Sequence, residues 1–273
     1  MTRILATAST EFLIALRNRW VAIAIAMMVI FSLVLSAAGS APTGALGADR
    51  LSVIVASLTS LAVYLVPLVA LLMSFDGVAG EVERGTLPLV LTYPISRTEL
   101  LLGKLLAHLA VLTLAVTAGY GCAAAAAVAV DADAAKGLPA LWRLMWSSVL
   151  LGAAFLCLGY GLSALSRRPA GAAGLAIGLW LLVVVLYDLG LLAAVVTDGG
   201  GWFTQKLFPW LLVANPADAF RLFNLAASDA TAAAAGIAGA ANSIPPLHAL
   251  VSIVLWPLLA LGGAVAIFRK VTP

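Results

Sequence analysis

Long apolar runs are the feature that most limits what this chain can fold into. A helix needs about 20 apolar residues to cross the hydrocarbon core of a bilayer. Six segments meet that requirement: 20–38, 51–75, 105–130, 144–166, 171–197 and 247–268. Only 10% of the residues are charged, against about a quarter in an ordinary soluble domain. We therefore predict an all-α integral membrane protein, a single membrane domain over residues 1–273 with six transmembrane helices.

Basic residues are divided unevenly between the two sides of this predicted membrane domain. The side that carries both ends of the chain holds Arg3, Arg17, Arg19, Arg84, Arg97, Lys104, Arg167, Arg168, Arg269 and Lys270. The other side holds Arg50, Lys136, Arg143, Lys206 and Arg221. Because positively charged loops stay in the cytoplasm, we expect both termini to be cytoplasmic. The net charge of +3 then follows from topology and requires no nucleic-acid partner.

Two segments on the predicted cytoplasmic side have their own pattern. In residues 1–18, apolar positions recur at helical spacing, which predicts an interfacial helix lying in the membrane plane. The segment 77–103 joins the second and third spans. It contains an apolar run from Leu87 to Leu91 that is too short to span the membrane and is broken by Tyr93-Pro94. Ser96 with Glu99 then fits a capping box at the start of a new helix.

The long segment 198–246, on the opposite side, contains a second helix signal. Asn215 followed by Pro216 and then Asp218 is typical of a helix start. Within the fifth span, Asp188 is a functional candidate because charges are costly in a membrane, but a structural hydrogen bond to a neighbouring helix explains it equally well. Gly171, Gly174 and Gly178 share one helical face, which predicts close helix packing there.

The segment 80–104 reads GEVERGTLPLVLTYPISRTELLLGK, and its pattern resembles the ABC-2 type transporter permeases. In that family the corresponding segment forms a cytoplasmic coupling helix that contacts an ATPase subunit. The resemblance therefore implies this coupling role for Gly80, Glu81, Glu83, Arg84, Gly85, Thr86, Leu87, Tyr93, Pro94 and Arg97. It extends over the whole chain and also implies a permease homodimer, two ATPase subunits that hold ATP and Mg, and the inner membrane of a bacterium.

A second motif, FPWLLVANPADAFRLFNL at 208–225, resembles the members of this family that serve maturation of the copper site of nitrous oxide reductase. Tyr187 and Asp188 support the same resemblance. It implies a periplasmic copper-binding partner contacted by Pro209, Trp210, Asn215, Asp218 and Arg221. The chain would couple ATP hydrolysis to export or to mechanical work on that partner.

Other functions remain as alternatives. Gly103-Lys104 lacks the further glycine and the hydroxyl residue of a P-loop, so we expect the ATPase activity in a partner rather than here. We also expect no bound cofactor and no metal site, since the histidines, cysteines and methionines form no ligand pattern. An ABC-2 exporter of another small substrate is one alternative. An ion-coupled secondary transporter centred on Asp188 is the other, although such proteins normally carry several charges at mid-membrane.

Overall fold

The computed structural model describes residues 2–38, 49–225 and 245–271, and all regular structure in these ranges is helical. The long helices are α2 (Arg19–Ala38), α3 (Arg50–Ser74), α6 (Arg97–Val130), α7 (Leu138–Leu165), α8 (Pro169–Trp180) with α9 (Tyr187–Asp198), and α14 (Pro246–Phe268). The shorter ones are α1 (Thr2–Arg17), α4 (Asp76–Glu83), α5 (Thr86–Val90), α10 (Phe208–Ala214) and α11 (Pro216–Leu225). A 3-10 turn, η2 (Ala132–Gly137), precedes α7, and the π-helical segments η3 (Leu181–Leu186) and η4 (Phe203–Leu207) precede α9 and α10.

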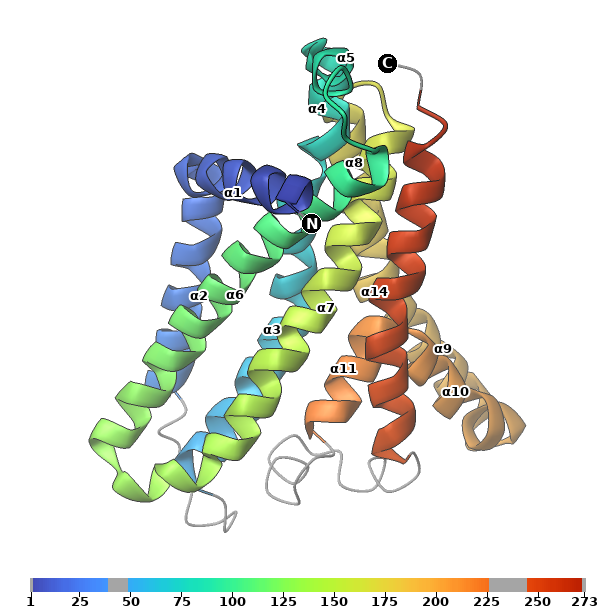
Figure 1. Ribbon diagram of the computed structural model, residues 1–273. Coiled ribbons are helices and arrows are strands. Elements are labelled where there is room, and N and C mark those ends of the chain that lie inside the picture. Colours follow the sequence, from blue (N-terminus) through green and yellow to red (C-terminus); the bar gives the residue numbers. More distant parts are fainter. Residues whose placement is uncertain (1, 39–48, 226–244, 272–273) are drawn as a thin grey trace.

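The predicted fold class is confirmed. In the described residues, five helices are long and apolar enough to cross a membrane, or up to six when α1 and α2, which meet at 72°, count as one bent span. Helix α2 itself, Arg19–Ala38, coincides with the first predicted span. Helix α1 turns away from the end of α2 and packs against α6 (Figure 1). It exposes Leu5, Leu13 and Ile14.

Helices α3 and α7 form the centre of the bundle. Each lies within a candidate span whose most apolar window is 67% buried, against 11% for α8–α9 and 17% for α14. Glycine allows α7 to approach α3, because a Cβ on Gly159 would lie 1.9 Å from Ser74 Oγ. Helices α8, α9 and α14 therefore leave large apolar surfaces uncovered by the described parts of this chain. Lipid or another subunit can cover these surfaces.

The glycine face of the fifth span behaves differently from the prediction. A Cβ on Gly174 or Gly178 would meet nothing within 4 Å, and one on Gly171 would meet only the side chain of Ser166. The close helix packing expected at these positions is therefore not made among the described residues.

Part of the segment predicted as an outer loop packs within the bundle. Helix α11 lies against α3, α7 and α14. Just before it, the carbonyl of Ala214 accepts a hydrogen bond of 2.9 Å from Trp256 Nε1, about 15 Å along α14 from Pro246 at 1.5 Å per residue. Helices α10 and α11 thus form a re-entrant hairpin, in which α11 packs within the bundle while α10 has no buried residue. Residues 226–244 of the predicted loop lie outside the described residues.

Candidate functional site: a protruding tip on an ion-paired base

Helices α4 and α5 project beyond the rest of the molecule at the end that also carries both ends of the described chain, here called the α5 end (Figure 1). Gly85 makes the corner between them. Its φ of +66° lies in the left-handed region, which glycine adopts without steric cost. The chain then turns at Tyr93-Pro94 and enters α6 through the predicted capping box, in which Ser96 Oγ accepts from the Glu99 amide and the Glu99 carboxylate accepts from the Ser96 amide.

The tip, defined as residues 83–94, presents an apolar surface to solvent. Tyr93 is 72% exposed and Leu89 is 64% exposed. Pro88, Pro94 and Glu83 are exposed beside them. Leu87, by contrast, is fully buried in the main hydrophobic core and anchors α5. An exposed apolar patch on a small protrusion is typical of a protein-binding surface.

The Asp76–Arg84 ion pair of 3.3 Å spans the length of α4. The two side chains meet over Gly80, where a Cβ would lie 2.0 Å from Asp76 Oδ1 and 2.7 Å from Arg84 Nη2. A larger residue at position 80 would push these two side chains apart. Gly80 therefore belongs to the support of the tip and not to its surface.

A buried lysine joins the base of the tip to two other helices. Lys104 of α6, with 5% of its side chain exposed, forms ion pairs with Glu81 of α4 at 2.7 Å and with Glu11 of α1. Both carboxylates are also largely buried, and Oε2 of Glu81 has no hydrogen-bond partner among the described residues. Because removing one member of such a group leaves an uncompensated buried charge, these three helices are strongly tied together.

Further contacts fix the same base. Ser163 Oγ of α7 accepts from the backbone amides of Val78 and Ala79 at 3.0 and 2.9 Å, and so satisfies two donors inside α4. Directly beside it, His108 Nδ1 lies 2.6 Å from Tyr160 Oη, and the ring of Tyr160 packs on Gly77. Helix α4 is therefore held by side chains from both α6 and α7.

Arg97 has a structural role at the C-terminal end of α14. Its guanidinium donates to the carbonyl oxygens of Phe268 at 2.8 Å and of Arg269 and Val271, and lies 5.7 Å from the centre of the Phe268 ring. These carbonyls would otherwise lack partners at the helix end.

The structure thus divides the predicted coupling residues into two groups. Glu83, Arg84, Gly85, Tyr93 and Pro94 are exposed on the tip. Gly80, Glu81, Thr86, Leu87 and Arg97 form its base: Thr86 donates to the Glu81 carbonyl at 3.3 Å, and the others make the contacts described above. The Lys104–Glu11 contact was not predicted, although a lysine directly before the predicted span 105–130 was a usable signal.

A second polar cluster joins Asp188 of α9 to the re-entrant hairpin. Arg221 of α11 forms ion pairs with Asp188 at 3.0 Å and with Asp218, whose side chain is 2% exposed. Asn215 donates to the Val183 carbonyl at 2.8 Å, and Tyr187 Oη donates to the Leu211 carbonyl at 2.8 Å. The hydrogen-bonding explanation of Asp188 is therefore realised in the structure.

Only part of the predicted partner-contact set lies on the surface. Asn215 and Asp218 are buried, whereas Trp210 is 62% exposed and packs edge-on against the His248 ring at 5.5 Å. Asn215 and Asp218 accordingly support the hairpin that presents Trp210 and Pro209. Among the described residues, no group of three or more His, Cys, Asp or Glu side chains is arranged to hold a metal ion.

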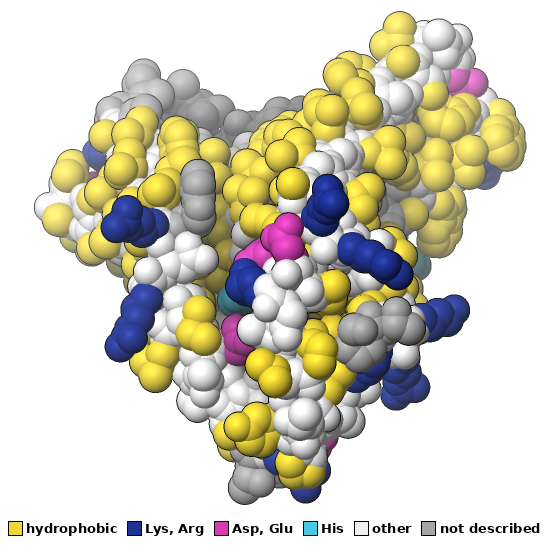
Figure 2. All heavy atoms as spheres, turned by 90° about the horizontal axis from the view of Figure 1, so that it is seen from above, with side chains coloured by type: hydrophobic (Ala, Val, Ile, Leu, Met, Phe, Trp, Pro, Cys, Tyr) yellow, Lys and Arg dark blue, Asp and Glu magenta, His cyan; other side chains and the backbone are white. Residues whose placement is uncertain are grey.

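The face around the tip is rich in basic side chains (Figure 2). Such a face, a protruding two-helix tip and apolar spans over most of the length are what the ABC-2 resemblance implies, and comparison with known proteins agrees. The family model for ABC-2 family transporter proteins matches residues 5–271. This chain belongs to the ABC-2 transporter family.

Two curated ABC-2 relatives match the chain along nearly its whole length. A "Probable ABC transporter permease protein NosY" from Pseudomonas aeruginosa is 43% identical over 267 residues, which cover 96% of each chain. A protein of the same name from Stutzerimonas stutzeri is 39% identical over 274 residues, which cover 99% of each chain. The chain is thus similar to ABC transporter permeases, the membrane subunits that work with a separate ATPase.

Proposed function

We propose that this ABC-2 permease acts as a homodimer and receives two ATPase subunits, similar to NosF, on the tips of its two copies. The observation that carries this proposal is the exposed apolar surface around Leu89 and Tyr93, held by a base that is ion-paired to α1 and α6. An exposed apolar patch on a rigid support is suited to receiving a mechanical push from a partner. In this proposal the α5 end faces the cytoplasm, in agreement with the positive-inside rule.

The proposed motion has a physical route to the opposite end. Helices α3 and α4 follow one another with a helical backbone at Phe75, and together count as one apolar helix from Arg50 to Glu83. Helix α3 packs against α11, and α11 is ion-paired to α9 through Arg221. A displacement of the tip therefore acts on the re-entrant hairpin without a flexible link between them.

The proposed output of this motion is supported by the similarity to permeases named NosY. We propose that the hairpin, through Trp210 and Pro209, acts on a periplasmic copper-binding subunit similar to NosD during maturation of the nitrous oxide reductase copper site. The exposed Trp210 beside His248 supports a protein contact here, because aromatic side chains are enriched in interfaces. Export of another small substrate uses the same tip and differs only in this last step.

The ion-coupled alternative receives less support. Asp188, the acid on which it depends, is already ion-paired to Arg221 and is only 24% exposed in its side chain. A carboxylate that shares its charge with a fixed guanidinium is poorly suited to binding and releasing an ion.

The test is co-purification of the permease with its ATPase from native membranes. Leu89→Asp combined with Tyr93→Ala removes the apolar surface of the tip and is expected to abolish ATPase recovery. Trp142→Ala, which truncates a comparably exposed side chain near the start of α7 at the opposite end, is the matched control and is expected to retain it. Full ATPase recovery with the tip variant would overturn the docking site. Recovery of the wild-type permease without any ATPase would overturn the function itself.

A further inference from the structure

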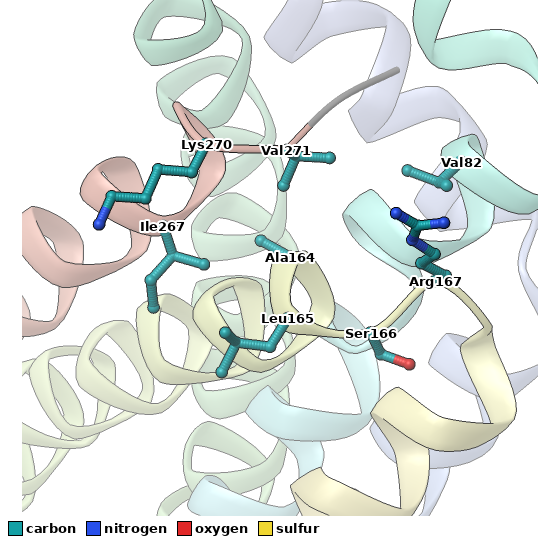
Figure 3. A pocket seen from close by; sticks show the side chains of 8 residues that line it. All are labelled: Val82, Ala164, Leu165, Ser166, Arg167, Ile267, Lys270 and Val271. Carbon is teal, nitrogen blue, oxygen red and sulfur yellow. The ribbon is translucent and has the colours of Figure 1, made fainter.

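A groove bordered by α7, α8 and α14 runs down the exposed side of the molecule. It begins at the α5 end as a cavity of about 350 Å³ lined by Val82, Leu165, Ser166, Arg167, Ile267 and Lys270, among others (Figure 3). Below it lie two further cavities of about 270 and 280 Å³. The first and second share Leu165 and Ile267, and the second and third share Leu158, Leu179 and Trp256. The three are therefore parts of one groove.

The dimensions of this groove suit an acyl chain. From Trp256 to its end at Phe268, α14 rises about 18 Å at 1.5 Å per residue, which exceeds the half-thickness of a hydrocarbon core about 30 Å thick. The second cavity is lined by apolar side chains together with Cys157 and two glycines. At Gly263 the groove is open, because a Cβ there would meet nothing within 4 Å.

The mouth of the groove is positively charged. Arg167 and Lys270 line it from two different elements, and both are exposed. No ion pair joins either residue to an acid among the described residues, and no acidic side chain lines any of the three cavities. The Ser166 hydroxyl, which donates to the Arg168 carbonyl at 2.8 Å, holds the turn that carries Arg167.

We propose that this groove is a binding site for an acidic phospholipid, with the headgroup at the mouth lined by Arg167 and Lys270 and one acyl chain lying along α14. Basic pockets between membrane helices are suited to anionic headgroups at this depth. A second copy of the chain fits less well. Two-fold symmetry about the membrane normal would place the same basic mouths opposite each other at the same height, where like charges repel.

The position of the site connects the lipid to the base of the tip. Val82, which lines the mouth, belongs to α4, next to the ion-paired Glu81. A bound headgroup therefore contacts the base of the tip, whereas most of the annular lipid around α8 and α14 contacts only apolar side chains.

The experiment is native mass spectrometry of the purified permease after exchange into nanodiscs containing equal amounts of phosphatidylglycerol and phosphatidylcholine. The wild type is expected to retain phosphatidylglycerol preferentially. Arg167→Gln with Lys270→Gln should reduce that preference at least about fivefold, since each basic residue near a headgroup favours anionic lipid by about that factor. The matched control, Arg17→Gln with Arg19→Gln, removes the same charge from the same end of the molecule and should leave the preference unchanged.

Two further measurements address the groove itself. Gly263→Trp should obstruct the acyl chain and lower retention while the charges remain. If this variant retains as much phosphatidylglycerol as the wild type, the groove is not the acyl-chain site. If the Arg17 and Arg19 control loses as much lipid preference as the Arg167 and Lys270 variant, the mouth of the groove is not a specific headgroup site. A Gly263→Cys variant in a background without Cys122 and Cys157 tests whether a second copy of the chain covers the groove. Cross-linking of two permeases in membranes through that cysteine would show that protein covers the groove and would also overturn the proposal.

Discussion

The Nζ atom of Lys104 lies 2.7 Å from a carboxylate oxygen of Glu81. This ion pair is buried at α4, the helix that carries the projecting helix α5. The same ammonium binds Glu11 of α1. One lysine thus connects the interfacial helix, a spanning helix and the base of the tip. The group carries two acids and one base, so its stability depends on the lysine more than on either acid.

Replacement of Lys104 by Met is expected to destabilise the permease by about 3–5 kcal/mol, because two buried carboxylates then face each other without a cation. The measurement is thermal unfolding of the purified permease in detergent. The matched variant Glu11→Gln, Glu81→Gln, Lys104→Met removes all three charges and should recover most of the loss. A single Lys104→Met variant as stable as the wild type would show that the ion pairs do not hold the base.

Leu87 and Leu89 lie two residues apart, but truncation of each should impair a different property of the permease. Leu87→Ala removes a fully buried side chain and is expected to cost about 2–5 kcal/mol of stability. Leu89→Ala, at a site 64% exposed, should leave the unfolding temperature nearly unchanged but weaken binding of the ATPase subunit. Unfolding and co-purification measured on both variants check this. Equal loss of stability in the two would mean that the tip packs differently from the structure.

Substitution by alanine at two glycines in different helices should also have different effects on stability. A Cβ on Gly103 would lie 2.6 Å from Thr7 Cβ and 3.1 Å from the Ile4 carbonyl oxygen, so Gly103→Ala pushes α1 away from α6. We expect it to cost about 1–3 kcal/mol. Gly174→Ala, which meets nothing within 4 Å in the monomer, should be neutral in a detergent-solubilised monomer. A large loss from Gly174→Ala confined to the dimer would place a second subunit against α8.

The cluster around Arg221 predicts a contrast between structural and transport roles. Arg221→Gln leaves Asp188 and the buried Asp218 without their cation and should destabilise the re-entrant hairpin. Asp188→Asn keeps a hydrogen-bond acceptor for Arg221 and should retain assembly and activity of the complex. Complementation in cells that lack the native gene checks both variants. Complete loss of activity in a stably folded Asp188→Asn protein would instead support an ion-coupling role for this acid.

Several elements could be predicted because local rules determine them. The capping box at Ser96 and the start of α11 after Asn215 both depend on side chains that satisfy nearby backbone amides, and both are present. The sixth predicted span and α14 likewise differ by a single residue at the start, 247 against Pro246, since its length is dictated by the bilayer.

Contacts between distant segments could not be predicted in the same way. Glu11 and Lys104 are 93 residues apart, and Arg97 is 171 residues from the Phe268 carbonyl that it caps. Glu81 and Arg97 were therefore predicted to face an ATPase subunit and not other helices of this chain, because sequence spacing does not reveal which distant helix comes to cover a charge. The burial of α11 was missed for a related reason: its apolar content is too low for a span, and only packing against α3, α7 and α14 accounts for its burial.

The nearly continuous helix formed by α3 and α4 also has a mechanical consequence. The hydrogen bonds from Ser163 hold it at Val78 and Ala79, close to one end. From Val78 the arm to Glu83 is about 8 Å long and the arm to Arg50 about 42 Å, at 1.5 Å per residue. A rigid tilt about that fulcrum moves the far end about five times as far as the tip. The fold thus has the geometry of a lever with a short input arm, in which a small, forceful movement on the ATPase side becomes a large, weaker one on the other.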